Sequence, residues 1–272
     1  MPKPIVLDAD DVLALLPKVD ALGAMRQLFA ELGHEQAVQP PQTLTLFPED
    51  RGDFITYLGA STGAKMFGAK LSPYLITPGK PVITAWTMLM SMETGRPLLL
   101  CDSGQLTTER TAATTALAVD LLARPGATRL AIIGSGKVAE AHLRHVGGLR
   151  NWSDICVFSP SIKAAHWQAL DPRVRIAPDA DAAVARADVV MLCTSSGTPV
   201  IGTDSLGAGV LVTSISTNVA NAHEVSPDFL PSAEVYCDYR KTTPAAAGEM
   251  KLAAARGWDA GQIRGDLGGL AI

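Results

Sequence analysis

The stretch that most constrains the fold of this chain is TRLAIIGSGKVAEAH, residues 128–142. A short apolar run at 130–133 leads into Gly134-Ser-Gly136, and an alanine-containing helical pattern follows from Val138. A buried strand, a tight glycine turn and a helix, in this order, are what a dinucleotide-binding βαβ unit requires. We therefore predict that this turn binds a dinucleotide; the alternative is a glycine turn that serves packing alone.

Each residue of the turn has its own predicted role in binding the dinucleotide. Gly134 allows the tight turn, and Gly136 lets the backbone approach a pyrophosphate with no Cβ in the way. The free N–H groups at the start of the helix favour phosphates, because they carry a partial positive charge. The predicted cofactor-binding residues of this segment are Gly134, Ser135, Gly136, Lys137 and Val138.

The chain follows different patterns before and after this unit. Residues 8–33 have helical spacing that Pro17 interrupts, and the apolar runs up to residue 101 then follow one another without crossover helices. This predicts an N-terminal α+β domain with a mainly antiparallel sheet. A helix is expected at 106–122. Beyond it, strands and helices alternate, which is typical of a doubly wound parallel sheet, here of about six strands.

These patterns predict an α/β protein of two domains. An α+β domain covers 1–112, a Rossmann dinucleotide-binding domain covers 113–240, and part of 241–272 is expected to join the first domain. The expected strands of the parallel sheet are 130–133, 155–158, 174–176, 188–193, 210–215 and 235–237.

Composition argues against several classes of protein. The net charge is −4 and no basic cluster is present, so nothing favours binding to nucleic acid or to an anionic membrane. The N-terminus has no apolar signal core, and no apolar run approaches the ~20 residues of a membrane span. We therefore expect a cytoplasmic protein.

The cysteines and histidines predict no metal site. The four cysteines form no C-x-x-C pair and lie in or beside apolar runs, so we expect reduced core residues rather than disulfides or metal ligands. His142 and His145 are one helical turn apart without an evident third ligand, and we expect them to be exposed. The cysteines are Cys101, Cys156, Cys193 and Cys237.

Several motifs occur in a fixed order between residues 95 and 136. They are Gly95-Arg-Pro-Leu98, Asp102-Ser-Gly104, Leu106-Thr107, Arg110-Thr-Ala-Ala113, Leu122-Ala-Arg-Pro125 and Gly134-Ser-Gly136. Together they resemble the ornithine cyclodeaminase/μ-crystallin family, and the resemblance extends over about residues 8–250. It implies a two-domain subunit whose first domain binds substrate and forms a homodimer. It also implies a nicotinamide cofactor and a small amino or imino acid substrate.

The resemblance assigns roles to two cationic side chains. Arg110, near the start of a helix, matches the arginine that holds the substrate carboxylate through a bidentate pair, with the helix N-terminus adding to the field. Lys70, inside an apolar strand run, matches the active-site lysine, which can hold the carboxylate or pass a proton to an imine nitrogen. The alternatives are a surface or capping arginine and a surface lysine that extends to solvent.

Two positions depart from the family pattern. Gln42 stands where many relatives carry an arginine, and Lys65 is a possible substitute. Asn218 stands where cyclodeaminases carry an aspartate, and an amide cannot act as a base. This counts against ornithine cyclisation and leaves Asn218 to orient the substrate. Relatives also continue further beyond the segment that follows Gly265.

The end of the second predicted strand bears on the choice of cofactor. NAD-preferring Rossmann folds place an acid there, whereas this chain has Ser159-Pro-Ser161 with Lys163 nearby. We therefore expect NADP(H) to be favoured over NAD(H), with these three side chains near a 2′-phosphate. Thr194 and Ser195 follow the fourth strand, where they would contact ribose or nicotinamide; the alternative is a Ser/Thr turn.

The leading hypothesis is an NAD(P)-dependent oxidoreductase that reduces a small cyclic α-imino acid, such as pyrroline-2-carboxylate. Arg110 would hold the carboxylate, Lys70 would protonate the imine and Asn218 would orient it. The alternatives are ornithine cyclodeaminase, an alanine-type amino acid dehydrogenase, and μ-crystallin-like binding of NADPH and a ligand without catalysis. The low aromatic content of 5%, together with Lys70 and Arg110, counts against the last.

Overall fold

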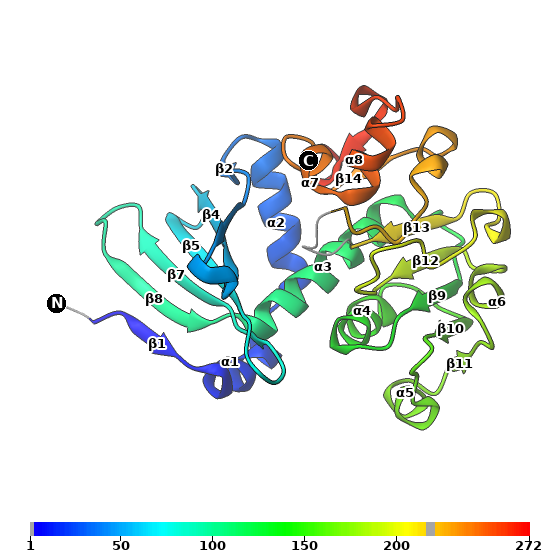
Figure 1. Ribbon diagram of the computed structural model, residues 1–272, viewed down its shortest axis with the longest axis horizontal. Coiled ribbons are helices and arrows are strands. Elements are labelled where there is room, and N and C mark those ends of the chain that lie inside the picture. Colours follow the sequence, from blue (N-terminus) through cyan, green and yellow to red (C-terminus); the bar gives the residue numbers. More distant parts are fainter. Residues whose placement is uncertain (1–2, 216–220) are drawn as a thin grey trace. The chain divides into compact units, whose positions relative to one another are not determined.

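The structure is a computed structural model that describes residues 3–215 and 221–272. Contacts divide the chain into two compact units (Figure 1). The first comprises residues 1–110 with 271–272, and the second comprises residues 111–270. Within the described ranges, none of the helices is long and apolar enough to cross a membrane.

The division between the units falls inside helix α3 (Gly104–Leu122), between Arg110 and Thr111. The sequence predicts this helix from residue 106 and the domain boundary after residue 112. The sequence-based prediction joins part of 241–272 to the first domain; in the structure residues 271–272 group with the first unit and residues 241–270 with the second.

The first unit begins with two helices whose ends are set by local side chains. They are α1 (Ala9–Leu15) and α2 (Ala21–Gly33). The Asp8 carboxylate accepts hydrogen bonds from two backbone N–H groups of the first turn of α1, each at 3.0 Å. Asp20 caps α2 in the same way at 2.9 Å. Pro17 lies in the short turn between them, so the predicted interruption at this residue is confirmed.

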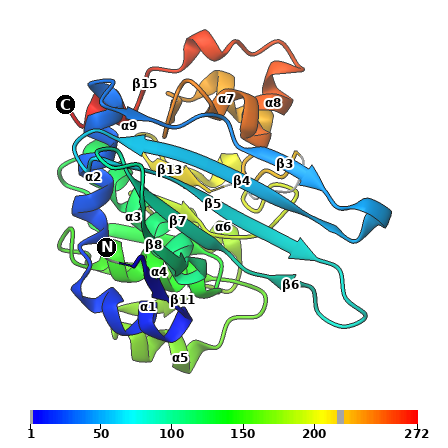
Figure 2. The same ribbon diagram turned by 90° about the vertical axis from the view of Figure 1, so that its left-hand side faces the viewer.

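The first unit contains one mixed sheet with the strand order β1-β8-β7-β5-β4-β2. Short strands β3 and β6 pair with β4 and β5, and Figure 2 shows the long strands β4 and β5 lying side by side. The strands are β1 (Ile5–Leu7), β2 (Ala37–Val38), β3 (Thr43–Leu46), β4 (Gly52–Ser61), β5 (Met66–Leu75), β6 (Val82–Ile83), β7 (Trp86–Ser91) and β8 (Pro97–Asp102).

Pairing in this sheet is antiparallel between neighbours, as predicted, except that β1 runs parallel to β8. The sequence does not reveal β1, because three residues are too few for a periodic pattern. Register places Tyr57 opposite Lys70 and Lys70 opposite Thr87. Opposed residues share a face of the sheet, so these three side chains lie on the same face.

The second unit is built on a five-stranded parallel sheet with the order β11-β10-β9-β12-β13. This confirms the doubly wound Rossmann fold. Its strands are β9 (Arg129–Ile133), β10 (Asp154–Phe158), β11 (Val174–Ile176), β12 (Val189–Leu192) and β13 (Leu211–Ser214). Its connecting helices are α4 (Lys137–Gly147), α5 (Ala164–Leu170) and α6 (Ala180–Val184).

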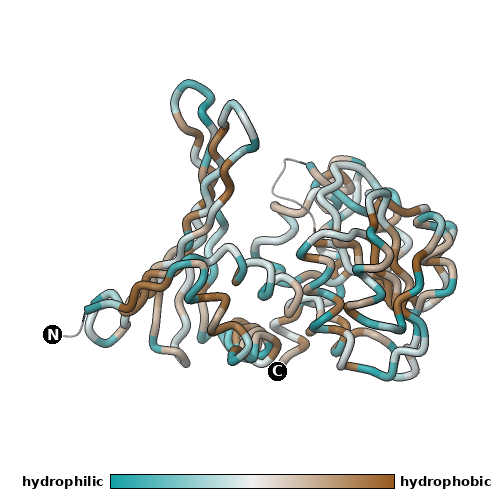
Figure 3. The backbone as a smooth tube through the Cα atoms, turned by 90° about the horizontal axis from the view of Figure 1, so that it is seen from below, coloured by the Kyte–Doolittle hydropathy of each residue, from teal (hydrophilic) through white to brown (hydrophobic). Residues whose placement is uncertain are grey.

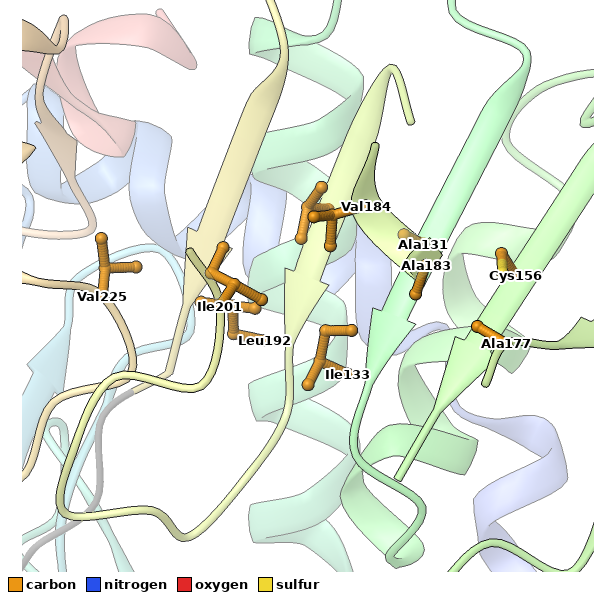
Figure 4. Packing of buried hydrophobic residues seen from close by; sticks show 10 residues of the cluster. Ala131, Ile133, Cys156, Ala177, Ala183, Val184, Leu192, Ile201 and Val225 are labelled. Atoms are coloured by element: carbon orange, nitrogen blue, oxygen red, sulfur yellow. The ribbon is translucent and has the colours of Figure 1, made fainter. Parts of the chain in front are cut away.

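The strands of this sheet are buried on both faces, which explains their continuous apolar runs. Figure 4 shows one side of the core, where Ile133 of β9 and Leu192 of β12 belong to a cluster that includes Ala183 and Val184 of α6. Hydrophobic stretches also run along the strands of the first unit's sheet (Figure 3).

The prediction of a sixth strand in the parallel sheet is wrong. Strand β14 (Tyr236–Cys237) pairs instead with β15 (Gly265–Asp266) in a separate two-stranded sheet. The run at 235–237 is apolar because Cys237 packs in a small cluster of its own with Leu230, Met250 and Trp258. Three short helices complete this region, namely α7 (Thr243–Ala246), α8 (Gly248–Ala254) and α9 (Leu267–Leu270).

All four cysteines are buried thiols, as predicted for core residues. Burial raises the pKa of each thiol above its ordinary value.

Candidate functional site

The glycine turn joins β9 to α4 in the second unit. Gly134 has a backbone φ of +123°, and a Cβ added there would lie 2.4 Å from the carbonyl oxygen of Cys193. Only glycine fits both conditions. The N–H of Gly134 donates to the carbonyl of Phe158 at 2.9 Å, which fixes the turn to the end of β10.

The start of α4 is open toward an anion. Gly136 is the N-cap of this helix, no side chain caps the helix, and no atom lies within 4 Å of a Cβ built on Gly136. Lys137 is exposed and Val138 is half-buried in the first turn. Uncapped N–H groups beside open space fit the pyrophosphate of a dinucleotide.

Ser159, one of the residues predicted near a 2′-phosphate, lies beside this turn. Ser135 Oγ and Ser159 Oγ are hydrogen-bonded at 3.0 Å, so the turn is linked to the residue that follows β10. Ser161 and Lys163 are exposed, and the backbone of Lys163 begins α5. Residues 159–163 contain no acidic side chain.

Thr194 is already engaged within the protein. Its N–H and its hydroxyl both donate to the Glu224 carboxylate, at 2.7 and 2.8 Å. Ser195 is exposed beside it. The sequence does not reveal Glu224, because a single acid between His223 and Val225 belongs to no motif.

The first unit brings Lys70 and Arg110 together. Lys70 Nζ lies 4.1 Å from the centre of the Tyr57 ring and donates to Thr107 Oγ1 at 3.2 Å. Burial and, to a smaller extent, the positive charge of Arg110 together lower the pKa of Lys70 from 10.5 to about 8. The lysine is therefore still mainly charged at neutral pH, and it loses a proton far more readily than a solvated lysine.

Hydrogen bonds to Ser103 fix the position of Thr107, the partner of Lys70. The Thr107 hydroxyl donates to the carbonyl of Ser103 at 2.9 Å, so its oxygen is available to accept from Lys70. The buried Ser103 hydroxyl in turn accepts from Thr87 Oγ1 at 2.8 Å. The sequence analysis assigns no role to these hydroxyls, although Thr107 stands in one of the family motifs.

Arg110 lies in the second turn of α3, because this helix begins at Gly104. The predicted contribution of the helix N-terminus therefore belongs to residues nearer Gly104, since the effect is confined to the first turn. Arg110 is exposed, so its guanidinium is accessible to an anion.

The sequence also singles out Lys65, Asn218 and His142. Lys65, a possible substitute for the arginine missing at Gln42, forms an exposed ion pair with Glu93 at 2.7 Å. Asn218 lies outside the described residues. The expectation that His142 is exposed is wrong, since its ring is fully buried between α4 and α3.

His142 is buried because both of its ring nitrogens have partners in the helices. Nδ1 donates to the carbonyl of Val138 at 2.7 Å, and Nε2 accepts from Thr115 Oγ1 at 2.9 Å. Within residues 3–215 and 221–272, no group of three or more His, Cys, Asp or Glu side chains is arranged to hold a metal ion.

The sequence is similar to a dehydrogenase and to a reductase. It is 52% identical over 268 residues to the NAD(P)H-dependent anabolic L-arginine dehydrogenase DauB of Pseudomonas aeruginosa, covering 97% of this chain and 85% of that protein. It is 27% identical over 223 residues to a Delta(1)-pyrroline-2-carboxylate reductase of Colwellia psychrerythraea, covering 78% of this chain and 71% of the other.

The fold matches solved structures over both units. An archaeal alanine dehydrogenase dimer with bound NAD superimposes with a TM-score of 0.89 at 22% identity, covering 98% of this chain and 84% of that one. Residues 3–267 match the family model of ornithine cyclodeaminase and mu-crystallin. The chain is an NAD(P)-dependent oxidoreductase, and it belongs to the ornithine cyclodeaminase/mu-crystallin family.

Proposed function

We propose that this chain reduces the C=N bond of a small α-imino acid to the corresponding amino acid. The observation that carries the proposal is the half-buried Lys70, held by Thr107 and Tyr57 beside a second cation, Arg110. Two adjacent cations suit a substrate that carries a carboxylate next to a basic nitrogen.

The two side chains have different tasks in this reaction. Arg110 binds the carboxylate through its planar guanidinium, which fixes the orientation of the adjacent C=N bond. Lys70 donates a proton to the imine nitrogen, and its lowered pKa makes this transfer easier near neutral pH. The imine carbon gains a hydride and the nitrogen gains a proton, so the product is the amine. Asn218 is proposed to orient the substrate.

The second unit would hold the nicotinamide cofactor, which supplies the hydride when it is bound. Gly134, Ser135 and Gly136 would receive the pyrophosphate, together with the backbone N–H groups of Lys137 and Val138. The open, uncapped start of α4 supports this assignment. Ser195 would face the cofactor beyond the end of β12.

We further propose that NADP(H) is favoured over NAD(H). Ser159, Ser161 and Lys163 would surround the 2′-phosphate, and no acid follows β10 to repel it. We expect Ser159→Asp to raise the NADH/NADPH ratio of kcat/KM by at least about tenfold, because a carboxylate repels the phosphate and accepts from the ribose hydroxyls. Asp204→Asn, an exposed change elsewhere in the unit, should leave the ratio unchanged. A ratio equally unaffected by Ser159→Asp would contradict the assignment.

Two forms of substrate fit this chemistry. A cyclic ketimine such as pyrroline-2-carboxylate carries its C=N bond already formed. An open-chain imine forms when a 2-oxo acid condenses with ammonia and loses water. The similarity to an L-arginine dehydrogenase supports an open-chain substrate with a cationic side chain as the second candidate.

The first experiment measures oxidation of NADPH and of NADH with two sets of substrates. One set contains pyrroline-2-carboxylate and its six-membered analogue, and the other contains the 2-oxo acids of arginine and alanine with ammonia. We expect imine-dependent oxidation that falls at least about a hundredfold in Lys70→Met and in Arg110→Met. Lys80→Met removes an exposed lysine of the same unit and should retain wild-type activity.

Other outcomes would assign the chain differently. Ammonia release from ornithine with catalytic NAD, without imine reduction, would identify a cyclodeaminase. Cofactor binding without turnover of any substrate would favour a binding protein of the μ-crystallin type. Undiminished activity of Lys70→Met would contradict the role given to this lysine.

We also propose that the chain forms a homodimer through the sheet of the first unit. Register aligns Val6, Leu100, Met88, Ala69 and Leu58 across five neighbouring strands, on the same face of the sheet. We call this line the apolar row. Its four larger side chains are between 39% and 62% exposed. A continuous apolar strip of this kind favours burial against a second copy.

A further inference from the structure

The carboxylate of Glu224 connects the ends of two adjacent strands in the second unit. Its Oε1 accepts from Thr194, two residues beyond β12, as described above. Its Oε2 accepts from the N–H of Ile215 at 2.9 Å and lies 3.1 Å from Ser214 Oγ, at the end of β13. Glu224 is completely buried, so both strand ends are fixed by a single side chain shielded from water.

A second buried carboxylate supports the first. Glu249 Oε1 accepts from the backbone N–H of Glu224 at 3.0 Å and from Ser214 Oγ at 2.6 Å. The preceding residue, Gly248, lies against the backbone of Ala222, and a Cβ there would come within 1.9 Å of the Ala222 carbonyl oxygen. The first turn of α8 is thus packed directly against the segment that carries Glu224.

Burying two carboxyl groups is costly unless their oxygens are hydrogen-bonded. Each oxygen of Glu224 has a backbone N–H partner, and those N–H groups belong to the carboxyl ends of β12 and β13. In open parallel α/β sheets, ligands bind at the carboxyl ends of the strands. The carboxylate therefore fixes the backbone at the edge of the sheet that a nicotinamide cofactor would use.

We propose that Glu224 is a positioning residue for the cofactor. It holds the backbone of Thr194 and Ile215 in place at the carboxyl ends of β12 and β13, where the nicotinamide end would bind, and Glu249 holds Glu224 through its backbone N–H. Neither carboxylate touches the cofactor. The part concerning the cofactor rests on the function proposed above.

The test compares two buried acids at opposite ends of β12. Asp188 immediately precedes this strand and accepts from Arg129 and from the backbone N–H groups of Thr128 and Arg129. Asp188→Asn and Glu224→Gln both replace a buried carboxylate by an amide of the same shape. In each variant at least one N–H group loses its acceptor, since an amide has only one accepting oxygen.

The readouts are the melting temperature and the dissociation constants of NADPH and NADH from fluorescence titration. We expect both variants to melt at lower temperature than the wild type. Only Glu224→Gln should weaken binding of the preferred cofactor, by about tenfold, which corresponds to one hydrogen bond to a charged group. Ser214→Ala, a smaller change that keeps the carboxylate, should weaken binding by about threefold.

Kinetics provide an independent measure. A displaced nicotinamide end should lower kcat of Glu224→Gln, while KM for the imine, which is bound by the first unit, changes little. Equal cofactor affinity and kcat in Glu224→Gln and Asp188→Asn would show that Glu224 only stabilises the fold. That result would overturn the inference and leave the proposed function intact.

The two proposals fail in distinguishable ways. If the wild type binds NADPH but reduces no imine, the proposed reaction is wrong, while the binding constants still decide the role of Glu224. If the wild type binds neither NADPH nor NADH, both are overturned. Should Glu224→Gln fail to fold, the affinity of Ser214→Ala decides, and wild-type affinity in that variant would contradict the inference.

Discussion

Lys70 combines partial burial, a nearby cation and a pKa of about 8. If its protonated form delivers the proton, kcat/KM for imine reduction should fall about tenfold per pH unit above pH 8. Arg110→Met removes the charge that lowers this pKa, so it should move the fall to higher pH as well as lower the overall rate. The measurement is a pH profile of both enzymes.

The control for this profile is the residual activity of Lys70→Met. This variant should show no fall near pH 8, because it lacks the titrating group. The same fall in Lys70→Met would assign the titration to another group, such as the imine itself.

The second prediction at the scale of one side chain concerns His142 and the pH dependence of stability. Burial lowers its pKa from 6.5 to about 4, so the unfolded chain binds a proton at a higher pH than the folded chain does. Stability from the neutral ring is fully present above pH 6.5 and is lost as the pH falls toward 4. We expect this residue to account for about 2 kcal/mol of the loss between pH 7 and pH 5.

Urea unfolding at these two pH values measures the loss directly. His142→Gln should be less stable than the wild type at pH 7, and its stability should depend less on pH, because it has no titrating ring. His145→Gln, one turn further along α4, should keep most of the wild-type pH dependence. Identical pH dependence in all three proteins would contradict the assignment to His142.

At the scale of elements, the end of α3 depends on one arginine. Arg150 Nη2 donates to the carbonyls of Val119, Asp120 and Ala123 at 3.2 to 3.3 Å, at the end of the helix where carbonyls run out of partners within the helix, although the Val119 carbonyl also accepts from the N–H of Ala123 at 3.1 Å. We expect Arg150→Met to lower the free energy of unfolding by about 2 kcal/mol, measured by urea titration. Arg186→Met, an exposed change, should alter it by less than about 0.5 kcal/mol. Equal effects would exclude a specific role in ending the helix.

Strand length explains which elements the sequence reveals. Strand β9 and its glycine turn are predictable because four consecutive apolar residues precede a glycine that only a tight turn requires. Strands β1 and β15 have three and two residues, so their pairing depends on distant segments that no local pattern records. For the same reason the sequence predicts the run at 235–237 as a strand of the parallel sheet, although its partner is β15.

The residues of the candidate site also differ in whether the sequence predicts them. Lys70, Arg110 and the glycine turn stand in motifs, and the resemblance identifies them. Thr107 and Glu224 gain their importance from hydrogen bonds across long sequence separations, to Lys70 and to Thr194. A sequence shows that such residues are present, but it does not show which distant groups they meet.

At the scale of the whole molecule, the apolar row predicts the oligomeric state. We expect a dimer in light scattering, and a monomer for the double variant Met88→Glu/Leu100→Glu, because two carboxylates in the apolar row would be buried without partners. Leu170→Glu places a charge on a helix of the second unit at similar exposure and should leave the dimer intact. A double variant that remains dimeric would place the interface elsewhere.

The buried thiols make this protein a convenient host for a single chemical label. All four cysteines are inaccessible, and their raised pKa values keep them in the unreactive protonated form. A thiol reagent should therefore leave the native protein almost unmodified and react at four positions after unfolding. A cysteine introduced at an exposed position such as Lys80 would then carry a fluorophore or spin label without background. Pairs of such labels, one in each unit, would report how the two units move when cofactor and substrate bind.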